Sequence, residues 1–428
     1  MNYLVFIPNG LNSPELEILL SKCQLIIDQK KKLEIIISPG FRDYACSKNI
    51  FSQKIISSIS NKIVKKGISL LRGEFKVRKI HKISNYEKII KKINFNNMDK
   101  LKNFKFENID FGNSVFSSYA GLSRDAEFEG LLRSYSCKRL LMTSLNIYSF
   151  FKEKVKLNKD LNIILYNGRH NETRPIVRLC EKEKISFSIM EYSGTGENDI
   201  GIREFKNHLP TDINKVEKLI KNFCKKKSSK INKCDYFFTY KKAGRVINDK
   251  ASYILKQNKK LLPHNWNNKN TNIVYFTSSQ DEYSCHGGIY DQTIYKNQKE
   301  SLYKIKNSFK KKYKFNKDYC LYIRCHPYLE KVFWKYNSDI FKLHEPQKNI
   351  YVIRPASKIS SYKLLMKADK VISYNSLMGI EAVYWQKPSI LLGRRPYENL
   401  NVVYKPKNHL DVMELIFKKN LIWLIWMV

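Results

Sequence analysis

The chain has 428 residues, 43% of them hydrophobic, and a formal net charge of +39 from 78 Lys and Arg against 39 Asp and Glu. This length and apolar content are enough for two ordinary cores, so two domains are expected. The lysines form short runs along the whole chain, with no arginine-rich stripe, RNP-like motif or zinc-finger spacing. The charge therefore favours anionic partners such as phosphorylated substrates or lipid headgroups. A specific nucleic-acid interface is not the first expectation, because none of its motifs is present.

Cysteine usage and hydropathy indicate where the protein resides. The nine cysteines are scattered without a CxxC pair, which favours neither a zinc site nor a disulfide framework. The opening MNYLVFIPNG has the pattern of a first strand and not of a signal peptide. No stretch reaches the ~20 apolar residues of a membrane helix. We therefore expect a cytoplasmic protein.

Strand-like and helical segments alternate in the first part of the chain, which is typical of the α/β class. Residues 76–110, rich in Lys and Asn, have no clear pattern and are expected to form an insertion or a loop-and-helix excursion. The patterned segments are, in chain order, a strand at 3–7, a helix at 13–23, a strand at 33–37, a helix at 50–70, a strand at 162–166, a loop and helix over 167–184, and a strand at 185–192.

Residues 205–262 are polar, lysine-rich and helical in pattern, and the strand–helix alternation resumes after them. The sequence thus predicts a Rossmann-like first domain with a helical bridge over 1–262 and a second Rossmann-like domain over 263–428. The segments of the second domain are strands at 272–279, 320–324, 349–355, 370–374 and 388–392, with helices at 297–312, 360–368 and 376–385.

The segment NSLMGIEA follows the strand at 370–374 and begins a helix. Ser376 can cap this helix or donate to a phosphate, and Gly379 leaves room for a ligand. Glu381 can accept hydrogen bonds from two ribose hydroxyls. The same spacing also fits an ordinary N-cap, a packing glycine and a favourable first-turn acid.

Two further strand ends carry polar groups. Arg324 and His326 lie in IRCHP, where a guanidinium can bind phosphate and an imidazole can donate a proton. Asp281 and Glu282 lie in FTSSQDEYS, where a carboxylate can act as base or nucleophile. A capped turn and a solvated acidic turn are the structural alternatives.

In the first domain, YNGRHNETRP follows the strand at 162–166. Asn167, Arg169 and Arg174 can bind an anionic or hydroxylated acceptor, or simply form a loop and a helix entry. All four polar segments end predicted parallel strands. Since ligands of open α/β sheets bind at the carboxyl ends of the strands, this coincidence favours a ligand site.

These ordered segments resemble the bacterial capsule and surface-polysaccharide biosynthesis proteins, which are similar in turn to the retaining β-Kdo transferases. The resemblance rests on YNGRHNETRP, YFTSSQDEYS, YIRCHPYL, RPYENL and, most specifically, VIRPASKISSYKLLMKADKVISYNSLMGIEAVYWQKPSILLG. It covers residues 162–401, and the loop that holds Asp281 and Glu282 departs from the Kdo-transferase pattern.

The resemblance implies a GT-B architecture, with two Rossmann-like domains and a donor cleft between them. It implies that Arg324 and His326 face the donor phosphate, that Ser376, Gly379 and Glu381 surround the nucleotide, and that Asp281 or Glu282 is catalytic. The sequence has no Asp-x-Asp triplet, so no metal or other cofactor is expected, and cationic side chains would stabilise the departing phosphate.

We therefore predict a metal-independent glycosyltransferase that uses a nucleotide-sugar donor and a glycan or lipid-linked glycan acceptor, with peripheral association at the inner membrane face. Asn167, Arg169 and Arg174 would bind the acceptor. A nucleotide-sugar epimerase of the same fold, a non-catalytic capsule assembly or export component, and a nucleic-acid binder are the alternatives. The sequence leaves the donor sugar and the stereochemical outcome open.

Overall fold

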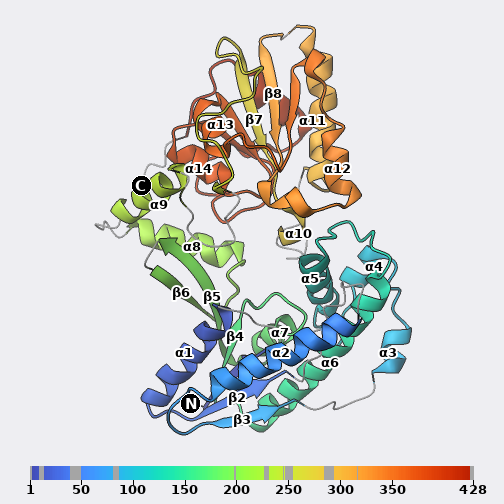
Figure 1. The fold of residues 1–428 in the computed structure, drawn as a ribbon, viewed down its shortest axis with the longest axis vertical. Coiled ribbons are helices and arrows are strands. Elements are labelled where there is room, and N and C mark those ends of the chain that lie inside the picture. Colours follow the sequence, from blue (N-terminus) through green and yellow to red (C-terminus); the bar gives the residue numbers. More distant parts are fainter. Residues whose placement is uncertain are drawn as a thin grey trace. The chain divides into compact units, whose positions relative to one another are not determined.

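The chain folds into two compact units, which are described separately. The computed structural model describes residues 2–8, 14–38, 50–80, 86–196, 199–225, 231–243, 245, 254–283, 294–315 and 317–424. Unit 1 comprises Met1–Ser193 and Ile200–Thr211, and unit 2 comprises Asp212–Tyr283 and Gly288–Val428, apart from two short exchanged segments. Each unit contains one sheet with helices on both of its faces (Figure 1).

The six-stranded sheet of unit 1 has the order β3-β2-β1-β4-β5-β6, and β1 to β5 run parallel. Its strands are β1 (Asn2–Ile7), β2 (Leu33–Ile37), β3 (Lys76–Lys79), β4 (Leu161–Tyr166), β5 (Ser186–Gly196) and β6 (Asp199–Lys206). Its helices are α1 (Glu15–Asp28), α2 (Ile50–Ile68), α3 (Glu87–Lys91), α4 (Met98–Lys102), α5 (Phe111–Ser123), α6 (Arg133–Leu157) and α7 (Arg174–Glu183).

The five-stranded parallel sheet of unit 2 has the order β11-β10-β7-β8-β9. Its strands are β7 (Thr271–Phe276), β8 (Tyr319–Arg324), β9 (Ile350–Ile353), β10 (Lys370–Ser373) and β11 (Ser389–Leu391). Its helices are α8 (Ile213–Lys225), α9 (Ile231–Lys242), α10 (Gln280–Tyr283), α11 (Gln298–Tyr313), α12 (Lys335–Phe341), α13 (Ser361–Lys367), α14 (Met378–Tyr384) and α15 (His409–Phe417), with short 3-10 helices η3 (Pro327–Lys331) and η4 (Pro346–Lys348).

Side chains alternate between the two faces of each sheet, so each unit has one part of its hydrophobic core on either face. In β1, Leu4 and Phe6 pack with α5, α6 and α7, whereas Val5 and Ile7 pack with α1. Successive side chains of a strand point to opposite faces, so a strand covered by helices on both faces is apolar along most of its length. The apolar runs of β1, β2 and β7 meet this requirement, which is why the sequence pattern located them.

Both sheets have the doubly wound order 3-2-1-4-5 when their strands are counted within the unit. This is the order of a Rossmann-like fold. The expected fold class, GT-B-like with two Rossmann-like domains, is thereby confirmed for the two units taken individually.

The division of the chain differs from the predicted boundary at residue 262. The helices α8 and α9 belong to unit 2, because their side chains pack within it. Phe238 stacks on Tyr384 with ring centroids 4.1 Å apart, and the Tyr384 hydroxyl donates to Asp235 at 2.6 Å. The segment at 76–110 contains the short helices α3 and α4, as expected of a loop-and-helix excursion, and it also supplies the edge strand β3, which the sequence analysis did not predict.

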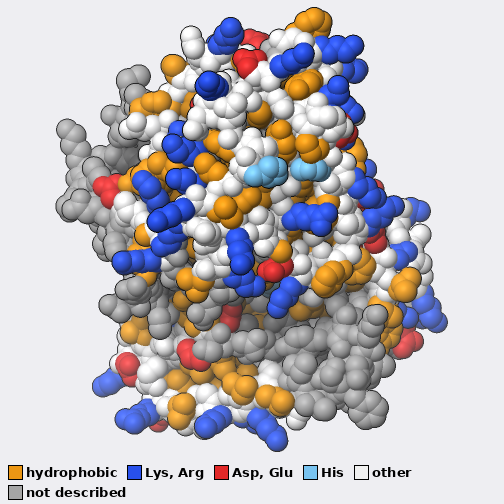
Figure 2. Space-filling model, turned by 45° about the horizontal axis from the view of Figure 1, so that its top comes forward, with side chains coloured by type: hydrophobic (Ala, Val, Ile, Leu, Met, Phe, Trp, Pro, Cys, Tyr) orange, Lys and Arg blue, Asp and Glu red, His pale blue; other side chains and the backbone are white. Residues whose placement is uncertain are grey.

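The surface is basic, and five cysteines are buried, namely Cys23, Cys137, Cys180, Cys320 and Cys325. Lys and Arg side chains are spread over the face shown in Figure 2 and do not gather in one stripe. Burial raises the pKa of Cys23 and of Cys325 to about 12, so both thiols remain protonated and act as small core side chains. Within the described residues, no helix has both the length and the apolar character needed to cross a membrane.

Candidate functional site

The carboxyl ends of β7 and β10 mark the point in the unit 2 sheet where the strand order reverses. From β7 the chain continues to β8 on one side, and β10 lies on the other. Ligands of doubly wound sheets bind at this point. The two loops there are tied together, because the Ser278 hydroxyl donates to the Tyr374 carbonyl.

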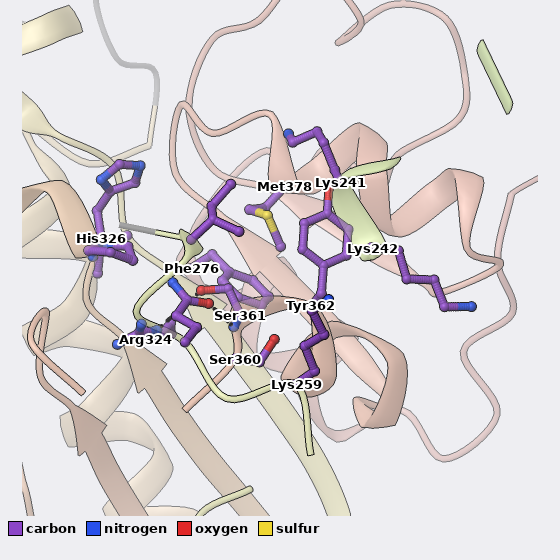
Figure 3. Close-up of a pocket in the computed structure, with 14 residues that line it drawn as sticks. Lys241, Lys242, Lys259, Phe276, Arg324, His326, Ser360, Ser361, Tyr362 and Met378 are labelled. Atoms are coloured by element: carbon purple, nitrogen blue, oxygen red, sulfur yellow. Dashed lines mark hydrogen bonds between the residues drawn. The ribbon is translucent and has the colours of Figure 1, made fainter. Parts of the chain in front are cut away.

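A pocket of about 650 Å³, partly open to solvent, lies at this edge of the sheet. Figure 3 shows Arg324 and His326 at one side of the pocket and Lys241 and Lys242 at another, with Met378 between them. None of the described lining residues is acidic. The lining residues are Lys241, Lys242, Ile254, Gln257, Lys259, Phe276, Thr277, Arg324, His326, Pro327, Ser360, Ser361, Tyr362 and Met378.

Arg324 is almost fully buried, with 1% of its surface exposed. Its Nη1 donates to the Arg354 carbonyl at 2.6 Å, and its Nε donates to the Ser361 hydroxyl at 3.3 Å. The guanidinium thus holds the loop after β9 and the start of α13 against β8. Arg324 also lines the pocket, and these two hydrogen bonds are made to protein groups, so its contact with a donor stays a prediction.

His326 begins the short helix η3 and is half-buried. Its backbone N–H donates to the Thr277 hydroxyl at 2.9 Å, which fixes it beside the end of β7. Its Nδ1 accepts from the Tyr328 N–H at 3.2 Å. Since Nδ1 acts as an acceptor, the proton of the neutral ring is on Nε2, and that nitrogen is a donor.

Glu381 lies directly behind the pocket wall and is only 2% exposed. Lys241 forms an ion pair with one carboxylate oxygen, and the Tyr362 hydroxyl donates to the other. Both partners line the pocket. The carboxylate predicted to meet ribose is therefore one side chain away from the cavity, and protein groups occupy both of its oxygens.

Ser376 and Gly379 serve the packing of the turn after β10. The Ser376 hydroxyl accepts from the Met378 N–H at 3.2 Å, and the N-cap of α14 is Leu377. A Cβ at Gly379 would lie 2.5 Å from both the Ser373 hydroxyl and the Tyr397 hydroxyl. These close contacts with protein side chains explain why residue 379 is a glycine, which agrees with the alternative that Gly379 serves packing.

The two candidate catalytic carboxylates have different environments. Asp281 is 2% exposed and accepts from the Ser279 hydroxyl at 2.6 Å, whereas Glu282 is exposed. Both belong to the short helix α10, and neither lines the pocket. The structure brings them to the edge where the pocket lies, at the end of β7.

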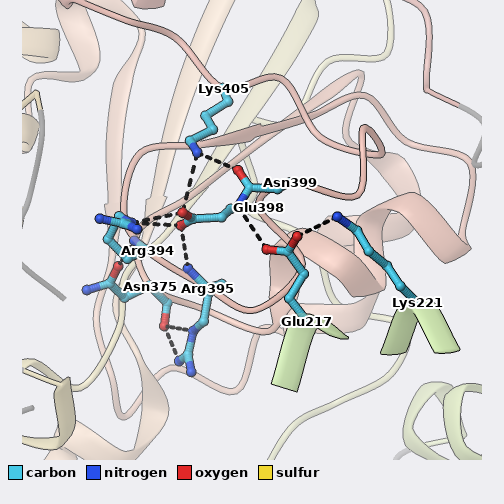
Figure 4. Close-up of polar contacts among 8 residues, drawn as sticks. All are labelled: Glu217, Lys221, Asn375, Arg394, Arg395, Glu398, Asn399 and Lys405. Carbon is cyan, nitrogen blue, oxygen red and sulfur yellow. Dashed lines mark hydrogen bonds and ion pairs between the residues drawn. The ribbon is translucent and has the colours of Figure 1, made fainter. Parts of the chain in front are cut away.

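A buried charge network fixes the turn after β11 (Figure 4). Glu398 is 4% exposed, and Arg394 Nε donates to both of its carboxylate oxygens at 2.9 Å. Arg395 Nε donates to the Asn375 carbonyl at 2.8 Å. A Cβ at Gly393 would lie 1.8 Å from Asn375 Oδ1, so only glycine fits there. The network joins the carboxyl ends of β10 and β11 into one rigid edge.

The predicted acceptor residues lie in unit 1, at the end of β4. Asn167 has a positive φ of 66°, and its Oδ1 accepts from the Arg169 N–H at 3.3 Å. Arg174 is 3% exposed, and its guanidinium pairs with Asp110, with an Nε to Oδ2 distance of 2.9 Å. Asn167 and Arg169 are half-buried and remain candidates for ligand contact, whereas Arg174 fastens α7 to the start of α5.

Several pocket residues were missed by the sequence analysis. Because the chain is rich in lysine, residue type alone did not distinguish the pocket lysines, which are Lys241, Lys242 and Lys259. Tyr362 belongs to a helix that was predicted, but its direction toward Glu381 depends on how α13 packs.

Two Rossmann-like units, one with a cationic pocket at its carboxyl edge, define the class of GT-B-like proteins. The family model for capsule polysaccharide biosynthesis proteins matches residues 186–407, just over half of the chain. The chain belongs to this family, as the resemblance of its motifs predicted.

The solved structures that are similar to this chain have low sequence identity to it. The KpsC β-Kdo 2,4 transferase of Thermosulfurimonas dismutans is 12% identical over 58% of this chain and 73% of that chain, with a TM-score of 0.37. A UDP-GlcNAc 2-epimerase of Methanocaldococcus jannaschii, solved with UDP-GlcNAc and UDP, is 12% identical over 99% of this chain and 94% of that chain, with a TM-score of 0.31. No curated protein matches the sequence significantly.

Proposed function

We propose that this protein is a glycosyltransferase that moves a sugar from a nucleotide-sugar donor to a capsule or other surface glycan. The observation that carries this proposal is the pocket of unit 2, in which three lysines, Arg324 and His326 surround the cavity without a lining acid. A nucleotide sugar combines phosphate, hydroxyls and an apolar base. The lysines suit the phosphate, and Phe276 and Met378 offer apolar surface.

The proposed reaction needs no metal. The bond between the anomeric carbon and the donor phosphate breaks, the acceptor oxygen bonds to that carbon, and its proton passes to Asp281 or Glu282 acting as base. Alternatively, one of these carboxylates acts as nucleophile. The pocket lysines and the Nε2–H of His326 stabilise the departing phosphate. Arg324 acts as a positioning residue, through the loop that its guanidinium holds.

The proposed acceptor is a glycan or lipid-linked glycan, bound through Asn167 and Arg169. We place the reaction in the cytoplasm at the inner membrane face, because a net charge of +39 attracts a protein to anionic lipid. No specific nucleic-acid partner is proposed.

The test is nucleotide release by the purified chain from CMP-, UDP- and GDP-sugars, with a lipid-linked acceptor present. We expect turnover with one donor class, unchanged by EDTA, and its loss in His326→Ala. His264→Ala is the matched control, because His264 is exposed and does not line the pocket. Inactivity of the wild type with all donors would contradict the proposal. An altered sugar nucleotide formed without acceptor would instead indicate an epimerase.

A further inference from the structure

A second hollow lies in unit 1, at the amino ends of its strands. It is lined by Asn2 at the start of β1, Leu33 of β2, Lys76 of β3 and Leu161 of β4. It encloses about 1,940 Å³ that are open to solvent. We call it the amino-edge groove.

Specific contacts fix one wall of the amino-edge groove. Gly73 has a φ of +113°, and a Cβ there would lie 2.4 Å from Cγ2 of Ile27. Beside it, the Arg72 N–H donates to Gln24 Oε1 at 2.9 Å, and Gln24 Nε2 donates to the Arg72 carbonyl at 3.0 Å. The turn before β3 is thus fixed against α1.

The chemistry of the groove is amphipathic. Five lysines against two glutamates give its lining an excess of three positive charges. Glu34 is already neutralised, because Lys154 Nζ lies 2.8 Å and Arg78 Nε 2.8 Å from its carboxylate. The apolar lining includes Tyr3, Ile27, Leu33, Phe75, Leu157 and Leu161.

The most exposed groups of the groove are of two kinds. Lys30, Lys31 and Lys32 form an exposed run at the junction of α1 and β2. Leu157, the last residue of α6, is 84% exposed. Long lysine side chains can place their charge at the headgroups while an adjacent leucine enters the acyl region.

We propose that the amino-edge groove docks unit 1 on an anionic membrane surface. A basic rim with an exposed leucine matches anionic headgroups over hydrocarbon, and polybasic segments bind such surfaces electrostatically. A soluble phosphate ligand would instead be expected to engage buried donors, and the lysine run here is exposed. This docking does not depend on the enzymatic activity proposed above.

The test is partition of the full chain onto vesicles of phosphatidylcholine with and without phosphatidylglycerol, measured by cosedimentation in the absence of donor. We expect binding only to vesicles with phosphatidylglycerol, and a loss of about tenfold or more in Lys30→Gln/Lys31→Gln/Lys32→Gln. The matched control removes three exposed lysines of the same unit, Lys88→Gln/Lys91→Gln/Lys92→Gln, and should bind like the wild type.

A second variant tests the apolar contribution. Leu157→Ser should weaken binding to phosphatidylglycerol vesicles while leaving the melting temperature unchanged, because the leucine is already exposed. Equal losses in the two triple-lysine variants would overturn the proposal, since they would indicate attraction by net charge alone. Full competition by soluble glycerol phosphate would also overturn it, in favour of a site for a free phosphate.

Discussion

At the residue scale, Glu381 joins the architecture of unit 2 to the proposed donor site. Its carboxylate is buried, and Lys241 and Tyr362 occupy both oxygens. If ribose hydroxyls bind Glu381, they replace these two partners. The residue then contributes to donor binding and to packing, so substitution by alanine would disturb both.

We predict that Glu381→Gln, which keeps the size and removes the charge, weakens donor binding about tenfold or more, since hydrogen bonds to charged groups contribute ~1.5–3 kcal/mol. Calorimetric titration with the donor measures this effect. Tyr362→Phe is the control, because it removes one partner of Glu381 and leaves the carboxylate charged. A Gln variant that is less stable than the wild type but binds the donor equally well would restrict Glu381 to a structural role.

The same residue shows the limit of prediction from sequence. A helix-start glutamate after a strand fitted a first-turn charge as well as a ligand contact, and the neighbouring strand ends and the family resemblance favoured the ligand contact. The pairing with Lys241 was outside the reach of local pattern, because the two residues are 140 positions apart. Arg174 is a similar case, since its partner Asp110 is 64 positions away.

At the scale of elements, an ion cluster joins α11 to α12. Asp339 accepts from Lys299 Nζ at 2.8 Å and from Lys342 Nζ at 2.9 Å. These hydrogen bonds lower the pKa of Asp339 from 3.8 to about 2. A carboxyl group whose pKa is lower in the folded state stabilises that state above its unfolded pKa, and this contribution is lost as the pH falls.

We therefore predict that Asp339→Asn lowers the melting temperature at pH 5 and that the difference from the wild type narrows as the pH falls from 4 to about 2. Thermal melts of both proteins across this range measure it. A difference that stays constant with pH would show that the carboxylate charge does not stabilise the fold.

The sequence predicted helices and strands correctly where burial requires a regular pattern of apolar residues. The strands β1, β2, β7 and β8 are largely buried and contain apolar runs, with few polar residues such as Glu34 in β2. Strand β3 was not recognised, because all four of its residues, KVRK, are exposed at the sheet edge. The helix α6 had no assignment either, since buried polar residues such as Ser144 and Asn146 interrupt its apolar pattern.

At the scale of the whole molecule, the hydrophobic core is divided in the same way as the chain. The clusters around β1 and β4 contain only residues of unit 1, and those around β7, β10 and the turn after β11 contain only residues of unit 2. A unit with its own core is expected to fold alone. The boundary near residue 212 can therefore be tested directly.

We predict that a fragment of residues 212–428 folds cooperatively and binds the donor nucleotide, whereas a fragment of 263–428 is less stable and binds it weakly. The shorter fragment lacks Lys241 and the ring of Phe238 that stacks on Tyr384. Circular dichroism melts and nucleotide titrations of both fragments measure the two properties. Equal stability and binding would favour the boundary at residue 262.

The strand β4 sets a distance that bears on the choice between priming and extending a glycan. Its first residue, Leu161, lines the amino-edge groove, and Asn167 follows its last residue. Six residues at ~3.3 Å each place these two ends about 20 Å apart. If the groove rests on a bilayer, an acceptor held at Asn167 has its growing end far above the headgroups. This geometry favours one kind of acceptor. A glycan that is already long enough to span this height would be preferred to a lipid that carries no glycan.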